Sequence, residues 1–202
     1  MNFRRRVLNI AAGKFDALED FVDRRNDNFF QVNVDTSYFS STQVLDIEQH
    51  YDNWGGYDNI KYYCNMDIFM FLERTRMKFD KIVIYRFLEH VSFTNIMYFI
   101  YLVSSVMEES GKVDIIVPNY NTLADMILNE SVSSPDFEKD NILLTTELLN
   151  EPSCPHASIW TPERATYFWE FEGRFEVKPE TVDPHFVFDG RNIYLRFQAE
   201  RI

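Results

Sequence analysis

Two groups of residues near the N-terminus have the types and the spacing needed to bind a ligand that carries a ribose. The apolar run Val7 to Ile10 ends at Ala11-Ala12-Gly13, and a second run, Phe30 to Val34, ends at Asp35. Small residues let a ligand approach the backbone, and a carboxylate can accept hydrogen bonds from both ribose hydroxyls. Asp35 follows Gly13 by 22 positions, close to the roughly 20 typical of a strand, helix and strand unit.

Other polar groups follow later apolar runs. Asn65-Met66-Asp67-Ile68 comes after Tyr62 to Cys64, and Glu89-His90 comes soon after Ile82-Val83-Ile84. Histidine titrates near neutral pH, so His90 and the more distant His156 are candidate general bases. The remaining histidines, His50 and His185, lack Cys, His or carboxylate partners at ligand spacing. No metal site is therefore predicted.

Strands and helices must bring these residues together. The chain alternates between short apolar runs, typical of strands, and segments whose apolar residues have helical spacing. A continuously apolar run is typical of a strand covered on both faces. We expect Gly111 to cap the long helix after the fourth strand. The predicted strands are Val7–Ile10, Phe30–Val34, Tyr62–Cys64, Lys81–Tyr85 and Val113–Val117, and the predicted helices are Phe15–Arg25, Ile68–Leu72 and Phe93–Glu109.

The C-terminal part changes character. Thr161-Pro162-Glu163 has the N-cap and first-turn residues of a helix that would run to about Glu172. Asp189-Gly190 between aromatic runs predicts a hairpin. The strands expected there are Phe175–Val177, His185–Phe188 and Asn192–Phe197. Together these elements predict an α/β fold: a doubly wound, mostly parallel sheet with helices on both faces and an antiparallel C-terminal hairpin.

In an open parallel sheet, ligands bind outside the carboxyl ends of the central strands. The residues at those ends resemble, in order, the motifs of class I, or Rossmann-like, S-adenosylmethionine-dependent methyltransferases of the small-molecule type. Leu8 to Lys14 is similar to the glycine-rich first motif and Asp35 to the acid of the second strand. Asn65 to Ile68 is similar to the third motif, and Phe79 to Val91 resembles the fourth-strand motif that ends in Leu-Glu-His. His156 to Thr161, before the last helix, resembles the segment before the family's last helix.

The resemblance implies that S-adenosylmethionine is the cofactor and that His90 and His156 serve catalysis. The implied cofactor-binding residues are Asn9, Ala11, Ala12, Gly13, Asp35, Thr36, Asn65, Met66, Asp67, Ile68, Tyr85, Arg86, Phe87 and His90. Asn9 stands near the family's usual acid, and Ala11 and Ala12 stand where glycines are usual. An asparagine carbonyl can still accept a hydrogen bond from the methionine ammonium, and alanine suits a position whose φ is negative.

Each of these residues also has a purely structural interpretation. Asp35 and Asp67 can close turns after strands, Glu89 and His90 can begin a helix, and His156 can be a loop histidine bonded to backbone. Two other functions therefore remain open. One is a cofactor-free binding or assembly module with this fold, and the other is a nicotinamide-dependent oxidoreductase, although the first turn lacks a full Gly-x-Gly-x-x-Gly.

Length, charge and cysteine content limit the kinds of binding partner and the location expected for this chain. A chain of 202 residues fits one domain, with a lid-like insertion at about 129–155. A net charge of −12 opposes binding to nucleic acid, and the cluster Arg4 to Arg6 is interpreted as a solvated end. No apolar run is long enough for a membrane span, and two cysteines without an export signal favour free thiols and a cytoplasmic location. The expected acceptor is a small molecule or a saccharide.

Overall fold

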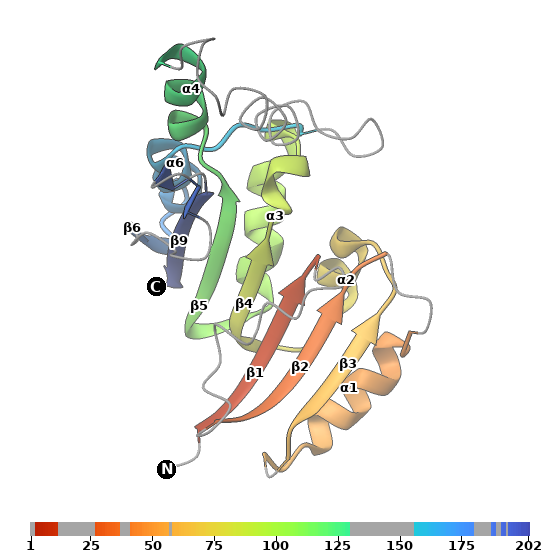
Figure 1. The fold of residues 1–202 in the computed structure, drawn as a ribbon. Coiled ribbons are helices and arrows are strands. Elements are labelled where there is room, and N and C mark those ends of the chain that lie inside the picture. The colour runs from red at the N-terminus through yellow and green to blue at the C-terminus, as the bar shows by residue number, and fades with distance from the viewer. Residues whose placement is uncertain are drawn as a thin grey trace.

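The computed structural model describes residues 3–11, 27–36, 41–56, 58–129, 156–179, 187–188, 191–192 and 194–202. Its centre is a seven-stranded sheet in the order β3-β2-β1-β4-β5-β9-β6 (Figure 1). The bounds are β1 Phe3–Ile10, β2 Asp27–Val34, β3 Ile60–Cys64, β4 Phe79–Tyr85, β5 Met107–Pro118, β6 Phe175–Pro179 and β9 Tyr194–Arg201.

The first five strands of the sheet run parallel, and the last two complete it differently. β9 pairs antiparallel with β5, and β6 pairs antiparallel with β9. The central strands carry continuous apolar runs, such as Ile82 to Ile84 in β4, and these residues are buried. The predicted mostly parallel sheet with an antiparallel C-terminal end is confirmed.

Four of the described helices share one hydrophobic core with the sheet. They are α1 Val44–Asn53, α2 Ile68–Arg74, α3 Phe93–Ser105 and α6 Pro162–Glu170, and they add Ile47, Phe71, Phe99 and Trp169 to a cluster that also holds Leu8. The helix α4, Tyr120–Asn129, follows β5 at the top of Figure 1. A short 3₁₀ helix, η2 Leu88–His90, lies between β4 and α3. The predicted cap of α6 is confirmed, because the Thr161 side chain accepts a hydrogen bond from the Arg164 amide.

Several predicted features lie outside the described residues. These are the helix Phe15 to Arg25, residues 130–155 of the expected lid, and the turn Asp189-Gly190. The strands on either side of that turn, β7 Val187–Phe188 and β8 Arg191–Asn192, are described and pair antiparallel. They form a separate two-stranded sheet, and the last strand of the main sheet begins only at Tyr194.

The predicted long helix is shorter than expected. α3 ends at Ser105, and Met107 to Glu109 belong to β5, so Gly111 lies within a strand and is not a helix cap. The strand pairing is irregular there, because Phe79 pairs with Met107 whereas Lys81 pairs with Lys112. Gly111 is required for space: a Cβ atom built on it would lie 2.9 Å from the carbonyl oxygen of Glu108.

The sequence predicted that the N-terminal arginines form a solvated end, but Arg6 makes specific contacts with other elements. Arg6 lies in β1, and its guanidinium forms ion pairs with Asp80 at 3.1 Å and Glu108 at 2.9 Å. It also donates a hydrogen bond to the hydroxyl of Tyr51. The pKa of Arg6 is raised, because these hydrogen bonds and charges outweigh the opposing effect of burial. Arg6 therefore ties β1 to β4, β5 and α1 at the end of the sheet opposite the strand ends that carry the candidate site.

Two further observations concern single residues and helices. Cys64, at the end of β3, is a free and buried cysteine. Within the described part of the chain, no helix is both long and apolar enough to cross a membrane.

We predict that Gly111→Ala lowers the free energy of unfolding by about 1–3 kcal/mol, because the added methyl group meets backbone that must shift. Urea denaturation measures the change. The matched control is Gly55→Ala at an exposed position, which should change stability by no more than about 0.5 kcal/mol. Equal stability of Gly111→Ala and the parent would contradict the space requirement.

Candidate functional site

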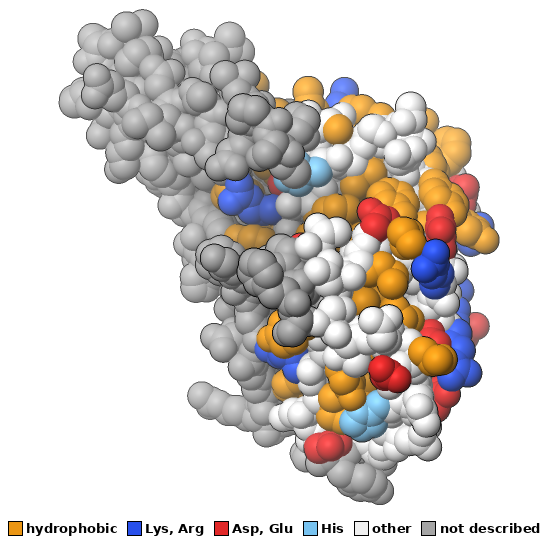
Figure 2. All heavy atoms as spheres, turned by 90° about the vertical axis from the view of Figure 1, so that its right-hand side faces the viewer, with side chains coloured by type: hydrophobic (Ala, Val, Ile, Leu, Met, Phe, Trp, Pro, Cys, Tyr) orange, Lys and Arg blue, Asp and Glu red, His pale blue; other side chains and the backbone are white. Residues whose placement is uncertain are grey.

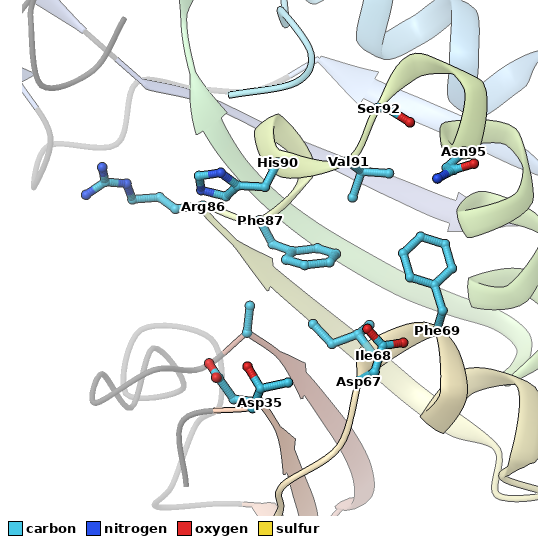
Figure 3. A pocket seen from close by; sticks show the side chains of 12 residues that line it. Asp35, Asp67, Ile68, Phe69, Arg86, Phe87, His90, Val91, Ser92 and Asn95 are labelled. Atoms are coloured by element: carbon cyan, nitrogen blue, oxygen red, sulfur yellow. The ribbon is translucent and has the colours of Figure 1, made fainter. Parts of the chain in front are cut away.

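A cavity of about 570 Å³ opens at the carboxyl ends of β1, β2 and β4 (Figure 3). This volume falls in the range of about 300–1,000 Å³ that is usual for small-molecule sites. Its lining residues come from the ends of several strands and from the starts of α2 and α3. They are Ala11, Asp35, Thr36, Asp67, Ile68, Phe69, Arg86, Phe87, His90, Val91, Ser92 and Asn95.

Two carboxylates lie on one side of this cavity. In Figure 3, Asp35 and Asp67 are across the open space from Phe87 and His90. Asp35 directly follows β2, and its amide donates to the carbonyl of Cys64 at 3.1 Å, which continues the pairing with β3. Asp67 is the N-cap of α2 and accepts a hydrogen bond from the Met70 amide at 3.0 Å. Asp67 therefore has a structural role as a helix cap, and its carboxylate also borders the cavity.

Two cavity residues have a left-handed backbone. Ala11 follows β1 with a φ of 54°, and Arg86 follows β4 with a φ of 50°. Alanine at position 11 was expected to have a negative φ, and this expectation is wrong. Non-glycine residues in this region carry strain, which often occurs at functional sites. Both residues turn the chain sharply where a strand meets the cavity.

Apolar side chains also line the cavity. Phe87 and Phe69 each pack against Phe99 of α3, with ring centroids 5.6 Å and 5.7 Å apart. Ile68 and Val91 are buried beside them. The cavity thus has Phe87 on one side, and on the other Ile68 lies next to the carboxylate of Asp67 (Figure 3). Such a surface can hold a flat ring and bind hydroxyl or amine groups at its edge.

Two histidines meet at the edge of the site. The rings of His90 and His156 are 5.0 Å apart between centroids and lie nearly perpendicular, with an interplanar angle of 64°. His156 Nδ1 is 2.8 Å from the hydroxyl oxygen of Tyr120 in α4. His90 lines the cavity. His156 is not among the lining residues, and its ring contacts the ring of His90.

Backbone hydrogen bonds hold His156 there. The amides of Ala157 and Ser158 donate to the carbonyl oxygen of Glu89 at 2.7 Å and 3.0 Å. The Ser158 hydroxyl donates to the Leu88 carbonyl at 2.8 Å and accepts from the indole of Trp160 at 3.0 Å. The segment 156–161 is therefore docked on η2 by three hydrogen bonds, and the fourth, from Trp160 to Ser158, lies within the segment.

Asn9, predicted to accept from an ammonium group, is not among the residues that line the cavity. Its side chain is fully buried and donates to the Asn33 side-chain oxygen at 3.1 Å. Gln31 donates to the same oxygen at 2.6 Å, and Asn33 donates in turn to the Tyr62 carbonyl at 3.0 Å. Asn9 Oδ1 is buried without a hydrogen-bond partner among the described residues. Ammonium binding by Asn9 stays a prediction.

Most of the other predicted residues that the structure describes do line the cavity. Ala11, Asp35, Thr36, Asp67, Ile68, Arg86, Phe87 and His90 are brought together, and Ala12 and Gly13 lie outside the described residues. Three more do not border it: Asn65 is exposed, Met66 packs on the core, and Tyr85 is half-buried at the end of β4.

Phe69, Val91, Ser92 and Asn95 line the cavity without having been predicted. All four lie where a loop after a strand enters the first turn of the next helix. Ser92 is the N-cap of α3 and Asn95 is in its first turn. Extending the strand-end rule by one helical turn would have found them.

The thiol near the site is not a candidate nucleophile. Burial raises the pKa of the Cys64 thiol, and the hydrogen bond with Ser41 only partly opposes this effect. A thiolate is the reactive form, so a raised pKa makes the sulfur inert at neutral pH.

Comparison with known proteins identifies the fold. No protein-family model and no curated protein matches the chain. A SAM-dependent methyltransferase from Methanosarcina mazei is 14% identical, with a TM-score of 0.58 over 100% of this chain and 94% of its own. An O-methyltransferase family protein from Burkholderia thailandensis is 13% identical, with a TM-score of 0.56 over 98% of this chain and 51% of its own. The plantazolicin methyltransferase BamL, solved in complex with SAH, is 12% identical. Its TM-score is 0.57, and the match covers 98% of this chain and 77% of BamL.

The chain has the fold of SAM-dependent methyltransferases. It spans about half the length of the Burkholderia protein, since only 51% of that chain is covered. The strand order and the antiparallel β9 of this methyltransferase fold place the cavity where the β1, β2 and β4 ends converge.

We predict that Ala11→Gly raises the free energy of unfolding by about 1 kcal/mol, because glycine adopts the left-handed backbone without strain. The gain is partly offset by the greater freedom of glycine in the unfolded chain. Ala165→Gly in α6 is the control and should lower stability by about 1 kcal/mol or more, since its backbone is helical. A loss of stability in Ala11→Gly, measured by urea denaturation, would refute the strain at Ala11.

Proposed function

We propose that this chain is an S-adenosylmethionine-dependent methyltransferase that acts on a small molecule or a saccharide. The observation that carries the proposal is the cavity at the carboxyl ends of β1, β2 and β4, with Asp35 and Asp67 across it from Phe87. The fold supports it, because this edge of the sheet is where open α/β proteins bind ligands.

The hydrogen-bond acceptors of the cavity fit this cofactor. Asp35, at the end of β2, would accept hydrogen bonds from the two ribose hydroxyls, and Asp67 would accept from the adenine amine. Ile68 and Phe87 would cover the faces of the adenine ring. When bound, S-adenosylmethionine supplies an activated methyl group to a nucleophile and is left as S-adenosylhomocysteine.

The residues proposed to act on the acceptor are His90, which lines the cavity, and His156, whose ring packs against that of His90. They lie where the cavity meets the docked segment 156–161. The main task of the protein would be to align the acceptor with the methyl group, since alignment can supply much of the rate enhancement. Acidic and basic side chains are interspersed on the face shown in Figure 2, and Lys and Arg form no continuous area among the described residues visible there. With a net charge of −12, this favours an acceptor other than a polyanion.

A thermal-shift comparison tests the proposal directly. The whole chain is melted alone, with S-adenosylhomocysteine and with NAD. A ligand present at about 100 times its dissociation constant stabilises a protein by roughly 2.7 kcal/mol. We expect stabilisation by S-adenosylhomocysteine only. Stabilisation by NAD instead would favour an oxidoreductase, and stabilisation by neither would favour a cofactor-free binding or assembly module.

We predict that Asp35→Ala weakens binding of S-adenosylhomocysteine by roughly 10- to 150-fold. The reason is that a hydrogen bond to a charged group contributes about 1.5–3 kcal/mol. Isothermal titration calorimetry measures the dissociation constant, and the melting temperature checks that the mutant is folded. Glu109→Ala removes the same charge from an exposed position at the amino end of β5 and should bind like the parent. Parent-like affinity in a folded Asp35→Ala would rule out the ribose contact.

Asp67 needs a gentler substitution, because its side chain also caps α2. Asparagine is an equally good N-cap, so Asp67→Asn keeps the helix while removing the charge. We predict that the affinity for S-adenosylhomocysteine falls by roughly 5-fold, corresponding to about 1 kcal/mol between a charged and a neutral hydrogen bond. The same titration tests this. An unchanged dissociation constant would mean that Asp67 acts only as a cap.

A further inference from the structure

Three side chains that can ligate a metal gather where η2 meets the segment 156–161. Glu89, His90 and His156 each offer one donor atom, and these atoms all lie within 4.8 Å of one another. We propose that these three residues bind a divalent transition-metal ion, which holds an oxygen of the methyl acceptor beside the cofactor cavity. The role of the ion toward the acceptor rests on the proposed function, whereas metal binding itself does not.

The geometry is close to that of a bound site. Donor atoms around a tetrahedral zinc ion at about 2.0–2.1 Å lie about 3.3 Å apart. The present donor atoms lie within 4.8 Å of one another, so metal binding needs them to move together by up to about 1.5 Å. His90 and His156 are half-buried, whereas Glu89 is buried.

Burial makes Glu89 a suitable anchor. Its side chain is fully buried, with a relative exposure of 0%. A buried carboxylate attracts a cation more strongly than an exposed one, because solvent screens its charge less. Together with two imidazoles, Glu89 offers a divalent cation one anionic and two neutral donor atoms. The backbone of Glu89 is fixed as well, because its carbonyl accepts from Ala157 and Ser158.

The surroundings also orient one imidazole. The Tyr120 hydroxyl lies 2.8 Å from His156 Nδ1. If Nδ1 carries the proton and donates it to this oxygen, the lone pair remains on Nε2, the form of histidine that binds metals. A hydrogen bond to the other ring nitrogen is the usual support of a metal-bound histidine. Tyr120 would thus be a positioning residue of the site.

The donor set selects the metal and its use. Two imidazoles and one carboxylate suit zinc and related transition metals, whereas magnesium prefers oxygen ligands. Three protein ligands leave at least one coordination position open, as in catalytic rather than structural zinc sites. Since His90 lines the cavity, this position would face the acceptor. A metal at this point favours an acceptor that reacts through oxygen, because a bound cation lowers the pKa of an oxygen ligand.

The test uses the tag-free whole chain, stripped of metal with a chelator and titrated with Zn²⁺ by calorimetry. We expect one saturable site with much weaker binding of Mg²⁺. His156→Ala and Glu89→Gln should each reduce Zn²⁺ affinity by at least about 100-fold, and Tyr120→Phe by about 10- to 100-fold. His50→Ala removes an imidazole from α1, away from the cluster, and should bind Zn²⁺ like the parent. Circular dichroism confirms that each variant is folded.

Two results would overturn the metal site. One is the absence of saturable Zn²⁺ binding by the parent chain, and the other is parent-like binding by folded His156→Ala and Glu89→Gln. S-adenosylhomocysteine is titrated separately into the metal-stripped protein. A chain that binds Zn²⁺ through Glu89, His90 and His156 but does not bind S-adenosylhomocysteine would support the metal site and contradict the proposed function.

Discussion

The site depends on the register of the parallel strands. Ile10 pairs with both Val34 and Ile84, so β1 and β2 end at the same level and β4 ends one residue farther along. The next residues, Ala11 and Asp35, therefore emerge side by side, and Arg86 follows one residue farther along its strand. A shift of one residue in any of these strands would turn Asp35 or its neighbour to the opposite face. Backbone hydrogen bonding thus brings together residues that lie up to 75 positions apart in the sequence.

This arrangement carries strain and buried polar groups, and the rest of the sheet stabilises both. Ala11 and Arg86 are held in the left-handed region, and their amides donate to Val34 and Ile116 at 3.0 Å and 2.9 Å. Below them, Asn9, Gln31 and Asn33 form a hydrogen-bonded group within the sheet, where apolar residues would be expected in two central strands. Polar groups in a core cost stability unless they are paired. Here the groups are paired with one another, since Asn9 and Gln31 both donate to the side-chain oxygen of Asn33.

The sheet could be predicted because its signals are local. Each central strand is a short apolar run followed by small or polar residues, and the Thr161-Pro162 pair marks the start of α6. The helix α1 was missed because Gln43 makes no side-chain cap and because the helix buries only Ile47 and Glu48. The end of α3 was misplaced because Met107 to Gly111 reads as helix followed by a cap, whereas pairing with β4 draws these residues into β5. Tertiary contact overrides local preference there.

The resemblance assigned both His90 and His156 to catalysis, but their direct contact could not be predicted from spacing. His90 and His156 are 66 positions apart, and nothing in the spacing of either one points to the other. Their meeting depends on the two amides that donate to the Glu89 carbonyl, and on Trp160, whose indole bonds Ser158 while its ring stacks on Phe197 of β9. The antiparallel strands thus do more than close the edge of the sheet. They support the segment that carries His156 to the end of β4, so the C-terminal part of the chain completes a site whose other residues come from the N-terminal half.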